Sequence, residues 1–184
     1  MNATSQKEAQ QVLDFWYGVK PVMWFKKDSG FDDEIRTKFF DIWQQAAAAE
    51  LSTWRDTIDG RLAEIIVLDQ FSRNLFRDQP QAFAQDPMSL VLSQEALRHC
   101  DYLKLAQNHT KFLIMPFMHS ESKTIQAQSV ALFKALGDAS SFDYAKQHKA
   151  IIDQFGRYPH RNKTLGREST TAEKEFLKQP GSSF

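Results

Sequence analysis

The segment from Gly60 to Leu75 constrains the fold more than any other part of the sequence, because it fits a helix that is apolar on nearly all sides. Projected at about 100° per residue, large apolar residues cover two opposite sides of this helix. They are Leu62, Ile65 and Ile66 on one side and Val67, Leu68, Phe71 and Leu75 on the other. Such a helix has to be surrounded by other elements, so we expect it near the centre of the fold.

The remaining periodic segments also indicate helices, and no segment alternates between apolar and polar residues for long enough to predict a strand. The expected helices are Ser5–Tyr17, Phe31–Ala49, Asp86–His99, Glu121–Leu136, Phe142–Phe155 and Thr170–Leu177. The apolar run Phe112–Met118 contains Pro116, which lacks an N–H and is expected to kink or end its helix. We therefore predict an all-α fold in a single domain over residues 1–184.

Composition limits the classes of partner. The chain has 23 basic and 23 acidic side chains without a long block of either sign, so we expect neither a nucleic acid nor a membrane as partner. The longest apolar run is too short to cross a bilayer, and the N-terminal residues are polar. A single cysteine, Cys100, excludes an internal disulfide and a CxxC metal site. These features predict a soluble, cytoplasmic protein.

The segment FGRYPHRNKTLGRES at 155–169 fits neither a helix nor a strand and is rich in hydrogen-bond donors. Those donors are Arg157, His160, Arg161, Asn162 and Arg167. Guanidinium and imidazolium groups recognise carboxylates and phosphates, so the segment predicts a site for a small anionic ligand or a peptide carboxylate. Alternatively, the arginines bind carbonyl groups at helix C-termini and hold the loop against the body of the protein.

Two further residues are candidates for this site. Asp69 and Arg73 lie one turn apart on the central helix and are expected to form a buried ion pair. In the alternative interpretation, Arg73 lines a pocket together with Gln70 and Asn74. His119 follows directly on the apolar run that ends at Met118, and we predict that it meets the arginine segment in one anion-binding pocket.

Motifs for metals, cofactors and familiar catalytic mechanisms are absent from the sequence. The spacing of His119, Glu121, His148 and His160 matches no metal site, and His148 falls in the apolar stripe of its helix. There is no GxSxG, no P-loop and no GxGxxG. We expect no metal and no cofactor.

Four strings carry a resemblance to a known family: LDFWYG at 13–18, LDQFSRNLF at 68–76, FLIMPFMHSES at 112–122 and FGRYPHRNKTLGREST at 155–170. Together with the pair Trp24-Phe25 they closely resemble the bacterial domain-of-unknown-function family numbered nine-two-four, over Val12 to Leu177. The resemblance implies antiparallel helices in a right-handed superhelix like that of tetratricopeptide-repeat proteins, although no repeat period is evident here. It implies no activity. Ser72 replaces the proline that usually follows LDQF in the family.

Two functions fit these observations. Repeat-like helical folds bind peptides or other proteins in a concave groove, which favours a binding module. The alternative is an enzyme acting on a small carboxylate or phosphate, with the arginines as a charge clamp and His160 or His119 as acid–base. In that enzyme, Glu121 or Asp69 would orient the histidine. A closed site that holds both the histidines and the arginines would favour the enzyme.

Overall fold

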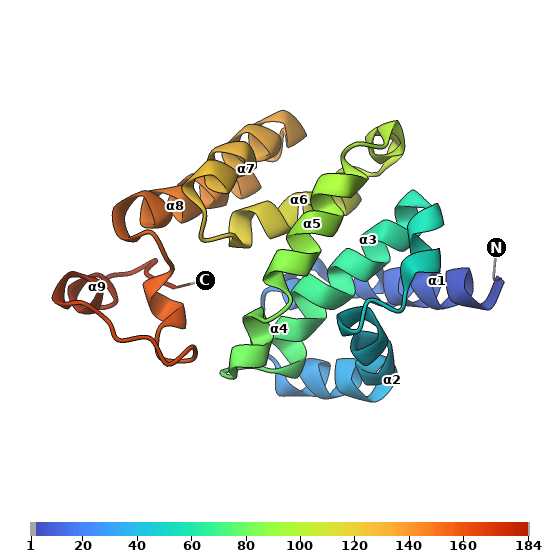
Figure 1. Ribbon diagram of the computed structural model, residues 1–184, viewed down its shortest axis with the longest axis horizontal. Coiled ribbons are helices and arrows are strands. Elements are labelled where there is room, and N and C mark those ends of the chain that lie inside the picture. Colours follow the sequence, from blue (N-terminus) through green and yellow to red (C-terminus); the bar gives the residue numbers. More distant parts are fainter. Residues whose placement is uncertain (1–2, 184) are drawn as a thin grey trace.

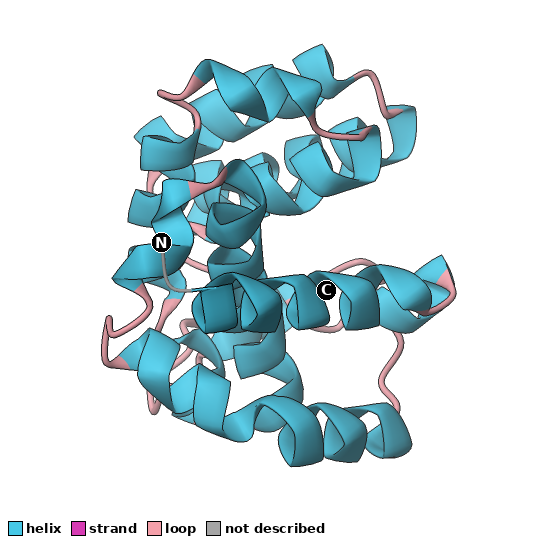
Figure 2. Cartoon of the chain, turned by 90° about the vertical axis from the view of Figure 1, so that its right-hand side faces the viewer, coloured by secondary structure: helices cyan, strands magenta, loops and turns pink. Residues whose placement is uncertain are grey.

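The computed structural model describes residues 3–183, together with their side chains except those of residues 3–5 and 100. In this range all regular secondary structure is helical (Figures 1 and 2), which confirms the predicted all-α class. The α-helices are α1 (Ala3–Gly18), α2 (Ser29–Ala47), α3 (Ile58–Ile66), α4 (Ser72–Leu75), α5 (Asp86–Ala96), α6 (Gln107–His119), α7 (Lys123–Leu136), α8 (Ala139–Phe155) and α9 (Thr171–Phe176). Short 3-10 turns occur at Pro21–Trp24, Ser52–Asp56, Pro80–Phe83, Cys100–Lys104 and Pro159–Arg161.

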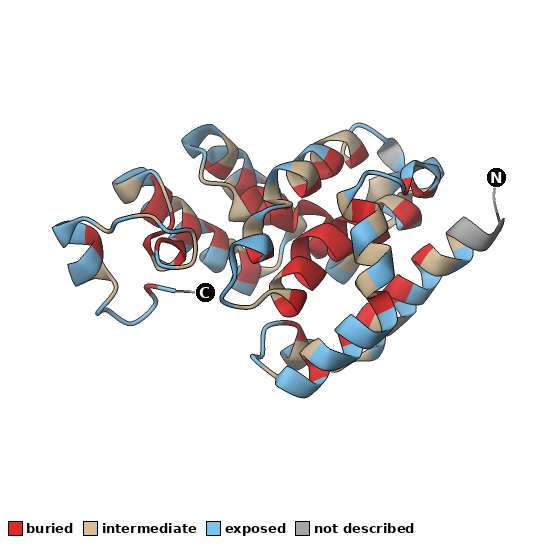
Figure 3. Cartoon of the chain, turned by 60° about the horizontal axis from the view of Figure 1, so that its bottom comes forward, coloured by how far each residue is buried: buried red, intermediate tan, exposed pale blue. Residues whose placement is uncertain are grey.

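The predicted central helix is central, but it is not a regular α-helix. Between α3 and α4 the residues Val67–Phe71 form a π-helical turn, and the backbone stays right-handed helical through both junctions. The apolar residues on both sides of this segment are buried, and α3 packs against α1, α5 and α6 (Figures 1 and 3). The π turn contains the whole LDQF string, so the side chains of this string are presented differently from those of an α-helix.

The start of α3 requires a glycine. Thr57 caps the helix by accepting a hydrogen bond from the Gly60 N–H. A Cβ atom on Gly60 would lie only 1.9 Å from the carbonyl oxygen of Trp54, a residue whose indole is completely buried. The close approach of two backbones, not a turn conformation, therefore explains this glycine.

Three consecutive helices, α6, α7 and α8, pack on one another and enclose a second apolar cluster formed by Ile114, Met118, Phe133 and Ala145. Pro116 lies inside α6, and the helix continues beyond it to His119. We expected α7 to start at Glu121. It starts at Lys123 instead, because Ser122 provides the cap by accepting from the Ile125 N–H.

The helices of the C-terminal third have well-defined ends. Gly137 ends α7 and Gly156 follows α8, both in the left-handed conformation that glycine adopts most easily. Thr170 and Glu173 form a capping box at the start of α9. Between α8 and α9, residues 157–170 run along the ends of α6 and α7 and contribute Tyr158 to the buried residues. No helix in the described range is both long and apolar enough to cross a membrane.

Candidate functional site

The π turn places Asp69 at the centre of a buried polar network. The Asp69 carboxylate is 1% exposed and accepts hydrogen bonds from His119 Nδ1 at 2.7 Å and from Gln70 Nε2. Arg73 Nη1 lies 3.1 Å from Asp69 Oδ1, so the predicted ion pair is present. His119 is the last residue of α6, so the carboxylate joins the central helix to the end of another helix. π-Helical turns often occur at functional sites.

Burial and the neighbouring charges determine the protonation of Asp69 and His119. Burial disfavours the charged carboxylate, but Arg73 and His119 outweigh it and hold the pKa of Asp69 well below its usual range. Burial, and next the charge of Arg73, lower the pKa of His119, so its imidazole is neutral at pH 7. An ionised carboxylate can only accept a hydrogen bond. His119 therefore carries its proton on Nδ1, and Nε2 has the free lone pair of a base.

Two arginines converge on a second carboxylate beside this pair. Arg73 Nη2 lies 3.0 Å from Asp86 Oδ1, and Arg161 Nη1 lies 3.0 Å from Asp86 Oδ2. The guanidinium carbon of Arg161 is 4.6 Å from the ring centroids of both Phe83 and Tyr158, so it is held between two aromatic rings. Arg161 Nε is buried and has no acceptor among the described residues. This N–H is a donor to which an oxygen of a ligand could bind.

Two more histidines and Tyr158 lie next to this network. Burial lowers the pKa of His148 to about 3 and that of His160 to about 4, so both imidazoles are neutral at pH 7. The Tyr158 ring centroid is 5.6 Å from that of each histidine. The Tyr158 hydroxyl donates to the Met118 carbonyl at 2.6 Å, accepts from Gln126 at 2.8 Å, and has its pKa raised by burial. Tyr158 thus fixes the loop against the end of α6.

The other predicted loop residues have partners within the C-terminal segment or, for Arg167, at Glu121 between α6 and α7. Arg157 makes two hydrogen bonds to the Glu173 carboxylate, at 2.7 and 2.8 Å. Arg167 binds Glu121 through both of its terminal nitrogens and donates from Nε to Asn162 Oδ1. Asn162 is buried and also donates to Ser169. These contacts hold the loop in place.

The structure thus divides the predicted set of residues. Arg73, His119 and Arg161 meet around Asp69 and Asp86, and the His160 ring lies next to that of Tyr158. Arg157, Asn162 and Arg167 hold the loop, and Arg157 and Arg167 also bind main-chain carbonyls, of Glu168 and Tyr158 respectively. In the described range no group of three or more His, Cys, Asp or Glu side chains is arranged to hold a metal ion.

Sequence reasoning missed Asp86 and Phe83 as members of this cluster. Asp86-Pro87 is a strong signal for the start of a helix, and it predicted Asp86 as the N-cap. The helix does start there, but Gln85 is the cap residue, and the Asp86 carboxylate binds Arg73 and Arg161 instead. Its two partners are 13 and 75 residues away along the chain. No local pattern contains such information.

Comparison with known proteins places these residues in a family. The family model described as "Bacterial protein of unknown function (DUF924)" matches residues 12–181. The chain belongs to this family. The resemblance inferred from the four strings is thereby confirmed, and the match contains all the residues of the Asp69–Asp86 cluster.

A solved structure has the same fold. It is the "Structure of Protein of Unknown Function ATU0120 from Agrobacterium tumefaciens", which is 34% identical to this chain with a TM-score of 0.89. The likeness covers 92% of this chain and 96% of that one. No curated protein matches the chain. The comparisons establish family and fold, and a function has to be inferred from the site itself.

Proposed function

We propose that this protein is an enzyme that binds a small carboxylate or phosphate beside Arg73 and Arg161 and transfers a proton through His119. The observation that carries the proposal is the hydrogen bond between His119 Nδ1 and the buried Asp69 carboxylate, 2.7 Å long, next to two convergent arginines. A carboxylate that fixes the tautomer of a neutral histidine is an arrangement that supports general-base catalysis.

The charge balance of the cluster limits what it can bind. Two arginines face two aspartates, and the three histidines are neutral at pH 7, so the formal charge is zero. A bound anion would therefore have to compete with Asp86 for the guanidinium groups. Arg161 favours the replacement of Asp86 by a bound anion, because its Nε has no acceptor and its side chain is only 7% exposed. Burial lowers the pKa of Arg161, which means that its charged form is incompletely compensated.

Binding and proton transfer can be tested separately. A panel of small carboxylates and phosphate esters would be titrated into the protein at constant ionic strength and followed by ¹H–¹⁵N NMR. The same panel would be incubated with the protein in D₂O, where a general base exchanges an activated C–H for deuterium. We expect saturable binding of at least one panel member that also carries a carbonyl group, with exchange at the C–H next to that carbonyl.

Variants with matched side chains identify the residues responsible. Arg161→Lys keeps the charge but removes Nε, and we expect it to weaken binding about tenfold, equivalent to about 1.4 kcal/mol. Arg157→Lys is the control, because Arg157 lies in the same loop but binds Glu173. His119→Gln should abolish exchange and leave the affinity within a few fold. Equal losses in the two lysine variants, or no binding across the panel, would contradict the site.

The same experiment distinguishes the enzyme from a binding module. Saturable binding without exchange in the unmodified protein would exclude the acid–base role and leave a module for an anionic ligand or peptide. The right-handed superhelix like that of tetratricopeptide-repeat proteins is also part of the proposal, supported by the successive packing of α6 on α7 and α7 on α8. A single domain and a cytoplasmic location stay predictions.

A further inference from the structure

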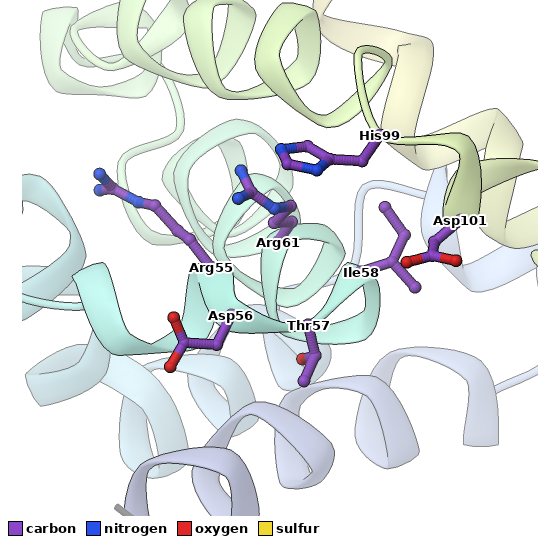
Figure 4. Close-up of a pocket in the computed structure, with 7 residues that line it drawn as sticks. All are labelled: Arg55, Asp56, Thr57, Ile58, Arg61, His99 and Asp101. Atoms are coloured by element: carbon purple, nitrogen blue, oxygen red, sulfur yellow. The ribbon is translucent and has the colours of Figure 1, made fainter. Parts of the chain in front are cut away.

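A small hollow lies at the other end of the central helix, away from the residues used above. It is formed by the turn Ser52–Asp56, the first residues of α3 and the residues that follow α5 (Figure 4). Its volume is about 60 Å³, which is room for a few water molecules or for one small oxyanion. The lining residues are Arg55, Asp56, Thr57, Ile58, Arg61, His99 and Asp101.

Most of the polar groups around this hollow already have partners. Arg55 binds the buried Glu64 carboxylate through two hydrogen bonds of 2.7 and 2.6 Å. Asp101 pairs with Lys104 at 2.6 Å. The hydroxyl of Thr57 accepts from the Gly60 N–H and donates to Gln6. None of these groups needs a ligand to complete its hydrogen bonding.

Arg61 and His99 differ from the other polar residues of the lining. Both residues line the hollow, and in Figure 4 the guanidinium of Arg61 and the imidazole of His99 point into the same region, whereas the carboxylate of Asp56 points away from it. In the described part of the chain no carboxylate pairs with the half-buried Arg61. Asp101 interacts electrostatically with His99, because the pKa of Asp101 is lowered mainly by Lys104 and to a smaller extent by His99. The guanidinium of Arg61 and the imidazole of His99 therefore both line the hollow, which also has Asp56 and Asp101 in its lining.

We propose that this hollow binds a single oxyanion group, a phosphate or a carboxylate, between Arg61 and His99. A guanidinium loses hydration when it is partly buried, and holding a long side chain in one place costs conformational entropy. An oxyanion offsets both costs, because it accepts charge-assisted hydrogen bonds from the guanidinium fork and from the imidazole. The site shares no residue with the Asp69–Asp86 cluster, and it stands whether or not that cluster is catalytic.

Inorganic phosphate and acetate are the probes that test this site, because they carry the two anionic groups without any other recognition element. Each would be titrated into the full chain at constant ionic strength, with chloride as the exchanged anion, and followed by ¹H–¹⁵N NMR. We expect saturable shifts of the amide signals of residues 55–61 and 99–101 with at least one probe. Arg61→Lys should raise the Kd about fivefold or more, and His99→Gln should have a similar effect.

Arg98→Ala is the matched control for these variants. Arg98 adjoins His99 in the sequence, and replacing it by alanine removes one positive charge, but Arg98 is exposed, pairs with Glu95 and does not line the hollow. Binding that is unchanged in Arg98→Ala but weaker in Arg61→Lys and His99→Gln supports the site. The proposal is overturned if neither probe gives saturable shifts at these amides. It is equally overturned if Arg98→Ala weakens binding as much as the two lining variants do.

Discussion

Replacing Asp69 by asparagine should destabilise the protein more than any other single change in the polar network. Asparagine keeps the volume and one acceptor oxygen, but it removes the charge and presents an NH₂ group to donors. The carboxylate is 1% exposed and has three partners, Gln70, Arg73 and His119. Water therefore cannot replace the charge and the hydrogen-bond acceptors that are lost with it. Breaking a buried ion pair from one side typically costs about 3–5 kcal/mol, and we expect Asp69→Asn to fall in this range.

The exposure of Arg73 predicts an asymmetry between the two partners. Arg73 is 21% exposed and can recover part of its hydration, and Asp86 keeps Arg161 when Arg73 is removed. We expect Arg73→Met to cost only about 1–3 kcal/mol. An ion pair considered by itself predicts that replacing both partners by apolar residues costs much less than replacing one of them. The contacts of Asp69 with His119 and of Arg73 with Asp86 change that expectation. The double variant removes both contacts, so His119 and Asp86 each lose one of their partners.

Urea unfolding followed by tryptophan fluorescence and circular dichroism measures these free energies. The double variant Asp69→Asn/Arg73→Met should cost less than the sum of the two single variants but not less than about 2 kcal/mol. For a chain of this size, the loss in Asp69→Asn corresponds to a fall in melting temperature of roughly 6–20 °C. A midpoint for Asp69→Asn equal to that of the unmodified protein would refute the reasoning, because it would mean that the carboxylate is hydrated or dispensable.

Two further predictions concern single residues. A change from glycine to alanine usually stabilises a helix by about 1 kcal/mol. Gly60→Ala should instead lower the free energy of unfolding in urea by about 3 kcal/mol or more, because the new Cβ would lie 1.9 Å from the Trp54 carbonyl oxygen. A stabilised variant would contradict this contact. Burial lowers the pKa of His148 to about 3, so between that value and about 6.5 the unfolded chain binds the extra proton and stability falls as the pH falls. His148→Gln should reduce this dependence by about 1.4 kcal/mol per pH unit between about pH 6 and pH 4.5, and parallel stability curves would show that His148 titrates normally.

The helices could be predicted from the sequence because their signals are local. The apolar stripes, the glycines at helix ends and the capping box of Thr170 and Glu173 each involve residues within one or two turns. Errors occurred where two local signals competed. Ser120 and Ser122 are both suitable caps for α7, and the structure uses Ser122 because Glu121 is bound by Arg167 and by the Tyr158 N–H.

The site could be predicted only in part, because its geometry depends on contacts between distant segments. The sequence indicated that Arg73, His119 and the 155–169 segment were candidates, since polar residues there interrupt apolar helices. It contained no signal that Asp86 would hold Arg161, or that Glu121 and Glu173 would hold Arg167 and Arg157. Many carboxylates were available, and only the packing of α5, α6 and α9 selects among them.

The π turn at Val67–Phe71 holds one residue more than an α-helical turn holds over nearly the same rotation. A chain with one residue deleted here could therefore continue as an uninterrupted α-helix, with the side chains beyond the deletion in nearly their present directions. Only the side chains within the turn, Asp69 among them, would change direction. A deletion inside the regular helix α3 would instead rotate every later side chain by about 100° about the helix axis. Relatives that lack one residue at this turn should therefore keep the contact between Arg73 and Asp86 and lose the one between Asp69 and His119.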